Sequence, residues 1–166
     1  MSVGADWREE GVTREEILAM EPGRELDVSV AVNVMGWQRW ESKGIDKVWP
    51  VIVPPMGDER HNWAAEWDEH GCPHWMPHYS TDISAAWEVV EKMQNTPCRD
   101  GDHFCARVEG FKNAHEAAFF HHLVGIPGDD GLEYYEARGI TAPEAICKAA
   151  LLAVIEEESQ CTPTAQ

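Results

Sequence analysis

The sequence predicts an α+β fold, a three-layer α/β/α sandwich in which helices cover both faces of a mostly antiparallel sheet. Four segments carry helix-start signals or apolar side chains at helical spacing. Three short segments between residues 104 and 137 carry strand-forming side chains separated by turn signals. Short connections favour antiparallel pairing, and helices on both faces would bury the apolar side of every element.

One domain accounts for residues 1–166. The hydrophobic content of 43% is enough for a core that needs neither a disulfide nor a metal ion. The polar ends, residues 1–12 and 159–166, are expected to be flexible. Residues 56–79 mix Gly, Pro, His, Trp and acidic side chains without a period, so we expect a long loop or insertion there.

Local signals define two helices before this loop. Thr13 and Glu16 have the spacing of a capping box, which should start a short helix that stops at Pro22. A second helix is expected over residues 24–35 because its aliphatic side chains share one face. Gly36 is suited to end it.

Strands are expected at residues 48–53, 104–111, 118–124 and 132–137. The first of these is interrupted by Pro50 and closed by Pro54 and Pro55. The other three are separated by short turn sequences, so they should pair with one another as an antiparallel sheet.

Two further helices should flank these three strands. The third helix is expected to begin with Asp82 as its N-cap and to end at Asn95. The last helix should start at a capping box formed by Thr141 and Glu144 and run to about residue 157. The apolar stripe expected on the third helix consists of Ile83, Ala86, Trp87, Val90 and Met93.

The net charge of −17, from 30 acidic and 13 basic residues, limits the partners of this protein. Duplex nucleic acid and anionic membranes bind basic surfaces, so neither is an expected partner. No apolar run approaches the roughly 20 residues that span a bilayer. The five cysteines follow no paired spacing and the first ten residues are polar, so we expect reduced thiols in a cytoplasm.

No catalytic motif stands out in the sequence. Ser80 and Thr81 are interpreted as helix-start residues, and the many carboxylates as solvated turns and helix ends. We therefore expect a binding protein rather than an enzyme, with no cofactor.

The densest polar cluster lies in the long loop. Imidazole and thiolate groups are good zinc ligands, but the spacing here matches no finger or ribbon, so we expect an exposed His-rich loop and no metal. The residues concerned are His61, His70, Cys72, His74 and His78. His121 and His122 are adjacent on a predicted strand, so they point to opposite faces and cannot chelate one ion together.

Three segments carry a family resemblance. They are EILAMEPGRELD at residues 16–27 with VMGW at 34–37, YSTDISAAW at 79–87, and TAPEAICKAALL at 141–152. These segments resemble the phage ABA sandwich domain family. The resemblance implies a helix–sheet–helix sandwich in a phage-encoded protein of the host bacterial cytoplasm.

The architecture implied by this resemblance is similar to that of the Thoeris anti-defence sponge proteins. Those proteins bind cyclic ADP-ribose-type signals, and some bind cyclic oligonucleotides, as oligomers that do not cleave the ligand. The resemblance therefore implies an anti-defence homo-oligomer that sequesters a nucleotide-derived signal. This implication rests on shared architecture.

Such a ligand requires aromatic faces for its base and cations for its phosphates. The candidate stacking residues are Trp37, Trp40, Tyr79, Trp87 and Phe111. The candidate phosphate-binding residues are Arg24, Arg39, Arg107 and Arg138, of which at least two should converge because the acidic background repels a phosphate. The rings could instead cap the sheet or fill an oligomer interface. Two other functions stay open: an acidic phage protein that inhibits a host protein, and a zinc-binding domain built on the His-rich loop.

Overall fold

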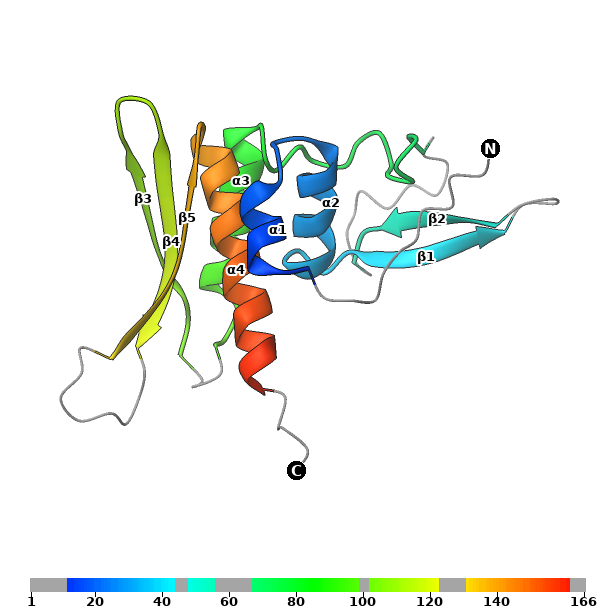
Figure 1. The fold of residues 1–166 in the computed structure, drawn as a ribbon. Helices are drawn as coiled ribbons and strands as arrows, with labels where there is room; N and C mark the ends of the chain where they lie inside the picture. Colours follow the sequence, from blue (N-terminus) through cyan, green and yellow to red (C-terminus); the bar gives the residue numbers. More distant parts are fainter. Residues whose placement is uncertain (1–11, 44–47, 56–66, 99–101, 123–130, 162–166) are drawn as a thin grey trace.

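The computed structural model describes five stretches of the chain, residues 12–43, 48–55, 67–98, 102–122 and 131–161 (Figure 1). Within them the fold is mixed α+β, with four helices and two small antiparallel sheets. The elements occur in the order α1 (Arg14–Ala19), α2 (Arg24–Asn33), β1 (Gln38–Lys43), β2 (Val48–Val53), α3 (Ile83–Gln94), β3 (Cys105–Gly110), β4 (His115–His122), β5 (Leu132–Gly139) and α4 (Ala142–Cys161).

The larger sheet has the strand order β3-β4-β5, and both of its strand pairs are antiparallel, as predicted. Ala117 in β4 lies opposite Val108 in β3 and Ala137 in β5, so these three side chains share one face. Helix α4 packs against β4 and β5, and α3 contacts β3 (Figure 1). This face of the sheet therefore forms one wall of the core.

Helix α4 is the centre of the core. Every side chain from residue 145 to residue 153 is buried, because the helix contacts the larger sheet as well as α1, α2 and α3. Lys148 lies within this segment, where its Nζ donates to Glu144 Oε1 at 2.7 Å and to the Leu18 carbonyl at 3.1 Å. The buried charge is thus paired. No helix in the described stretches combines the length and apolar character needed to cross a bilayer.

All four helices lie on the same side of the larger sheet in the part of the chain that the structure describes (Figure 1). Helices α1 and α2 pack on the side of α4 that faces away from the larger sheet, and not on the opposite face of the sheet. The expectation of helices on both faces is therefore not confirmed. The physical reason is that antiparallel strands can bury one face and present polar residues on the other, as the alternation of buried and exposed side chains in β5 shows.

The capping box predicted for α1 is confirmed, whereas the one predicted for α4 differs in one of its two bonds. At α1 the Thr13 hydroxyl accepts from the Glu16 amide, and the Glu16 carboxylate accepts from the Thr13 amide, as predicted. At α4 the Glu144 amide donates to the Thr141 hydroxyl, but the Glu144 carboxylate accepts from the amide of Ile140, one residue earlier than expected. Both arrangements satisfy amide groups that the first turn of a helix leaves unbonded.

Several boundaries differ from the sequence-based expectation. Strand β1 was not predicted, because its sequence QRWESK lacks alternating apolar side chains; it pairs with the predicted β2. Helix α2 ends at Asn33, and Gly36 turns the chain toward β1 with φ +78°. Strand β4 begins at His115 instead of residue 118, and α4 continues to Cys161.

Helix α3 begins after Asp82, which accepts from the Ser84 amide as the predicted N-cap. Two residues expected on its apolar face, Ile83 and Trp87, are exposed. The buried face is rotated away from them and consists of Ala85, Ala86, Val89, Val90 and Met93.

Candidate functional site

The face of the larger sheet that no described helix covers carries charged and aromatic side chains. Residues directly opposite one another in an antiparallel pair project to the same side, so the side chains form rows across β3, β4 and β5. We call this surface the open sheet face. Its rows are Cys105, Phe120 and Tyr134, then Arg107, Ala118 and Glu136, then Glu109, Glu116 and Arg138.

Arg107 and Arg138 converge on one carboxylate of the open sheet face, that of Glu116. Arg138 Nε donates to Glu116 Oε2 at 2.8 Å, and this bond raises the pKa of Arg138 above its ordinary value. Arg107 Nη2 lies 3.5 Å from the other oxygen of the same carboxylate and 3.8 Å from Glu136 Oε2. Arg107 Nε is also 3.5 Å from Glu109 Oε1. Two guanidinium groups from the outer strands therefore meet over the central strand.

An aromatic pair lies beside these arginines. The rings of Phe120 and Tyr134 stack with centroids 5.2 Å apart and planes inclined by 30°. Tyr134 is exposed, so part of its ring faces solvent. Between the aromatic row and the third row, the central strand contributes only the small side chain of Ala118. Ala118 is itself buried, because Arg107 reaches across it toward Glu136. A flat group laid on these side chains would meet aromatic carbon at one end and guanidinium nitrogen at the other.

The charges of the open sheet face nearly cancel. Its two arginines are outnumbered by its three glutamates, so an anion is not attracted by the face as it stands. A phosphate would have to replace Glu116 as the shared partner of the arginines. The arginine side chains are 44% and 75% exposed, but that of Glu116 is only 9% exposed, so this exchange requires the ligand to displace a largely buried carboxylate.

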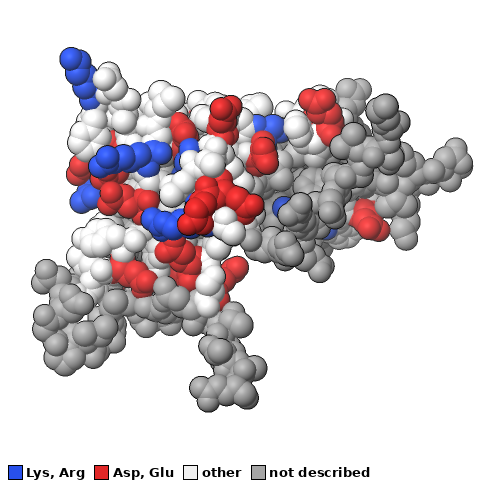
Figure 2. All heavy atoms as spheres, viewed as in Figure 1, with Lys and Arg blue, Asp and Glu red and all other residues white. Residues whose placement is uncertain are grey.

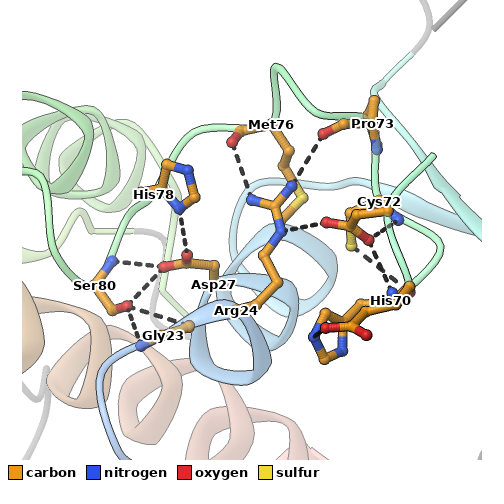
Figure 3. Close-up of polar contacts among 11 residues, drawn as sticks. Gly23, Arg24, Asp27, His70, Cys72, Pro73, Met76, His78 and Ser80 are labelled. Atoms are coloured by element: carbon orange, nitrogen blue, oxygen red, sulfur yellow. Dashed lines mark hydrogen bonds and ion pairs between the residues drawn. The ribbon is translucent and has the colours of Figure 1, made fainter. Parts of the chain in front are cut away.

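Arg24, a predicted phosphate-binding residue, is a structural clamp instead (Figure 3). Its Nε donates to Asp68 at 2.8 Å, and its two terminal nitrogens donate to the carbonyls of Met76 and Pro73 at 3.1 and 3.0 Å. These bonds tie the start of α2 to the loop before α3. Because all three nitrogens are engaged and the side chain is largely buried, Arg24 is not placed to receive a ligand.

A second polar contact reinforces this clamp. The fully buried Asp27 accepts from both the amide and the hydroxyl of Ser80 at 2.7 Å through one carboxylate oxygen. Its other oxygen lies 3.4 Å from His78 Nδ1 (Figure 3). The Ser80 hydroxyl also accepts from the Gly23 amide at 2.9 Å. Ser80 is therefore a buried structural residue that binds the start of α2, and not a residue that starts α3, whose N-cap is Asp82.

Two of the predicted stacking residues fill the core. Trp37 and Tyr79 are both buried, and the Trp37 ring packs against that of Trp75 with centroids 5.6 Å apart. These rings offer no face to a ligand in this structure. The remaining predicted stacking residues, Trp40, Trp87 and Phe111, are exposed on β1, on α3 and at the end of β3 respectively.

Arg39 and Trp40 lie on the β1–β2 hairpin, which extends away from the helices (Figure 1). They are consecutive residues of a strand, so their side chains point to opposite faces. Trp37 is buried, and Arg39 and Trp40 point to opposite faces, so these three candidate ligand residues do not form one site. Of the nine predicted ligand residues, the structure brings together Arg107 and Arg138.

The His-rich loop gives no metal site among the residues that the structure describes. His61 lies outside them, and His70, Cys72, His74 and His78 do not form a group of three ligand atoms. Cys72 is buried, and burial raises the pKa of its thiol to about 12. A thiol of this pKa is protonated near neutrality, which disfavours metal ligation. Four cysteines with described side chains, Cys72, Cys98, Cys105 and Cys147, are free thiols, as expected.

Sequence reasoning missed three contributors to the open sheet face: Glu116, Phe120 and Tyr134. The signal that could have found them is the alternation within β4 and β5, which places every second residue on the outer face. The predicted strand over residues 118–124 began too late to include Glu116.

One family model and one solved structure each match most of this chain. A family model described as the phage ABA sandwich domain matches residues 29–151, which include both sheets. No curated protein matches the chain. A solved structure, described as a phage protein from Bacillus cereus ATCC 14579, is 24% identical, with 82% of this chain and 89% of that chain covered and a TM-score of 0.43.

Proposed function

Because this chain belongs to the phage ABA sandwich domain family, we propose that it is an anti-defence protein that sequesters a nucleotide-derived immune signal without cleaving it. The ligand class is a cyclic ADP-ribose-type molecule or a cyclic oligonucleotide. The observation that carries the proposal is the convergence of Arg107 and Arg138 on Glu116, beside the stacked rings of Phe120 and Tyr134.

The two arginines supply the phosphate-binding part of the proposed site. A guanidinium group offers a planar fork of N–H donors that matches a phosphate or a carboxylate equally well. Glu116 now occupies the position that a phosphate would take between Arg107 and Arg138. Its carboxylate holds the two cations in place, and the ligand replaces it.

The aromatic pair supplies the base-binding part. Each aromatic ring that stacks on a base contributes about 1–3 kcal/mol in single-stranded nucleic acid complexes. Tyr134 is the more accessible of the two rings, and Phe120 supports it from the neighbouring strand. An aromatic ring stacks on any base. This pair therefore favours nucleotides as a class without distinguishing one base from another.

A flat sheet face cannot enclose a small ligand by itself. Sequestration of a scarce signal requires nanomolar affinity, about −12 kcal/mol, and most of the ligand surface must then be buried. We therefore include a second copy of the chain in the proposal. Alternating arginines and glutamates allow two open sheet faces to oppose each other with unlike charges in contact.

The binding test uses purified protein and a panel of cyclic ADP-ribose isomers and cyclic dinucleotides, measured by thermal shift and calorimetry. One member should bind at nanomolar concentration and be recovered intact by mass spectrometry after denaturation. The double variant R107Q/R138Q should lose at least about 100-fold in affinity, while the matched control Lys92→Gln on α3 retains it. Glu116→Gln should bind several-fold more tightly, because it removes the competing negative charge.

Two outcomes would contradict this proposal. One is the absence of binding to every member of the panel by a folded protein. The other is equal binding by the wild type and R107Q/R138Q, which would locate the ligand elsewhere. Conversion of the ligand to a new product would contradict the non-enzymatic part alone.

The net charge of −17 favours a second candidate function, inhibition of a basic host protein by charge complementarity. Figure 2 shows basic and acidic side chains interspersed on the side of the molecule in view, instead of a continuous acidic surface. Salt-sensitive capture of one basic host protein, unaffected by R107Q/R138Q, would support this candidate against the first.

A further inference from the structure

The inner face of the larger sheet holds a cluster of possible metal ligands. His121 in β4 lies directly opposite Glu133 in β5, and the last turns of α4 bring Glu157 against both. His121 is fully buried, and the two glutamates are largely buried. This cluster lies on the opposite side of the sheet from the open sheet face, so it belongs to neither the proposed ligand site nor the Arg24 clamp.

The three ligand atoms lie close to the spacing that a small divalent ion requires. His121 Nε2 is 2.8 Å from Glu157 Oε1 and 3.7 Å from Glu133 Oε2. All three atoms lie within 4.8 Å of one another. Metal–ligand bonds of about 2.0–2.2 Å place neighbouring ligand atoms roughly 3.0–3.5 Å apart. Shifts of a few tenths of an ångström would bring the two measured separations into this range.

Surrounding groups fix the orientation of these ligands. The Tyr135 hydroxyl donates to Glu157 Oε1 at 2.7 Å, and burial together with this carboxylate raises the pKa of Tyr135, so the hydroxyl stays a donor. The His121 ring packs edge-on against Phe104 and stacks with Tyr135, at centroid distances of 5.5 and 6.2 Å. Second-sphere hydrogen bonds and packed rings of this kind are what orient metal ligands in known sites.

We propose that His121, Glu133 and Glu157 bind a divalent first-row transition-metal ion of the Zn²⁺, Mn²⁺ or Fe²⁺ class. One imidazole nitrogen favours these ions over Ca²⁺ and Mg²⁺, and two carboxylates disfavour Cu⁺, which prefers sulfur. His121 ligates through Nε2, the ring nitrogen that faces both glutamates. The dication neutralises two carboxylates in a largely buried environment.

The bound ion joins three elements of the fold. It links β4 and β5 to the last turns of α4, the part of that helix that extends beyond residues 145–153 at the centre of the core. Binding to the folded state alone stabilises that state by mass action. At a free metal concentration about 100-fold above the Kd, the unfolding midpoint should rise by about 5–10 °C.

The test uses the full chain, dialysed against a chelator and then titrated separately with ZnCl₂, MnCl₂ and MgCl₂. One equivalent of Zn²⁺ or Mn²⁺ per chain should be retained after gel filtration, measured by elemental analysis, and the thermal midpoint should rise. Mg²⁺ should produce neither effect at the same concentration. The isosteric variants Glu133→Gln and Glu157→Gln should fold, by circular dichroism, and lose both effects, whereas the control Glu88→Gln on α3 keeps them.

The exposed histidines of the loop provide the competing explanation. The double variant H70Q/H74Q should still bind one equivalent of metal per chain and show the same rise in thermal midpoint. The proposal is overturned if H70Q/H74Q removes them, if Glu133→Gln and Glu157→Gln bind metal as the wild type does, or if the wild type retains no ion. The last result would leave the cluster as a hydrogen-bond network. None of these results depends on nucleotide binding, which is tested separately.

Discussion

Arg24 and Arg138 make the same primary bond in different surroundings. Each donates through Nε to a carboxylate oxygen at 2.8 Å. The side chain of Arg24 is 13% exposed and donates to two backbone carbonyls as well, whereas that of Arg138 is 75% exposed. Water therefore reaches the guanidinium group of Arg138 far more readily than that of Arg24.

This difference indicates which polar residues maintain the fold and which are available to bind a ligand. Arg24 and Asp27 connect α2 to a loop about 50 residues further along the chain, so their bonds are part of the tertiary structure. Arg107 and Arg138 are held by glutamates of the same sheet. A ligand that replaced Glu116 would displace this largely buried carboxylate, but it would break no bond to a distant segment of the chain.

The largest expected effect comes from breaking the Arg24 clamp. Arg24→Gln leaves Asp68 and two carbonyl groups without their cationic partner in a largely buried site. The free energy of unfolding should fall by about 2–4 kcal/mol. Arg24→Lys keeps the charge but replaces the fork by one nitrogen, so its loss should be intermediate. Urea denaturation measures both, and a loss below about 0.5 kcal/mol for Arg24→Gln would mean that the clamp is not structural.

A smaller loss of stability is expected when Asp68 is protonated at low pH. Burial alone would raise the pKa of this carboxyl, but hydrogen bonds from the Cys72 and His70 amides and from Arg24 outweigh it and lower the pKa below its usual value of 3.8. The folded state therefore binds this proton less readily than the unfolded chain. The stabilisation is fully present above about pH 4 and is lost as the pH falls through the folded-state pKa.

The measurement is urea denaturation at pH 7 and pH 3 on matched variants. Asp68→Asn should be less stable than the wild type at pH 7, and the difference should narrow at pH 3. Glu69→Gln, a change in the exposed neighbouring residue, should follow the wild type at both values. If Asp68→Asn lost as much stability on acidification as the wild type, Asp68 would not be the group responsible.

The sequence predicted those parts of the fold that depend on neighbouring residues. The capping residues Thr13 and Asp82 act over one helical turn, and both were found where expected. Strand β1 was missed because its polar sequence shows no periodicity, and only its pairing with β2 makes it a strand. The uncovered face of the larger sheet could not be predicted either, because it depends on where the helices pack.

The candidate site was predicted only in part, because the sequence gives the residue types but not the contacts between distant segments. Arginine and aromatic side chains suggested a class of ligand, and Arg107 and Arg138 were among the candidates. Which of the candidates meet depends on the register of β3, β4 and β5, which brings both arginines to Glu116. Arg24 was misassigned because its partners lie 44 to 52 positions away in the sequence.

The smallest expected effect on stability comes from Arg138→Gln. The Arg138 side chain is exposed, and the largely buried Glu116 keeps Arg107 as a cationic partner in the variant, so the urea midpoint should fall only slightly. The same substitution should weaken binding of the nucleotide-derived ligand by at least about tenfold, because one of two phosphate-binding groups is lost. Arg24→Lys should show the reverse pattern, a lower midpoint with unchanged affinity in the folded protein. Equal loss of stability in the two variants would show that exposure does not separate the structural arginine from the binding arginine in this fold.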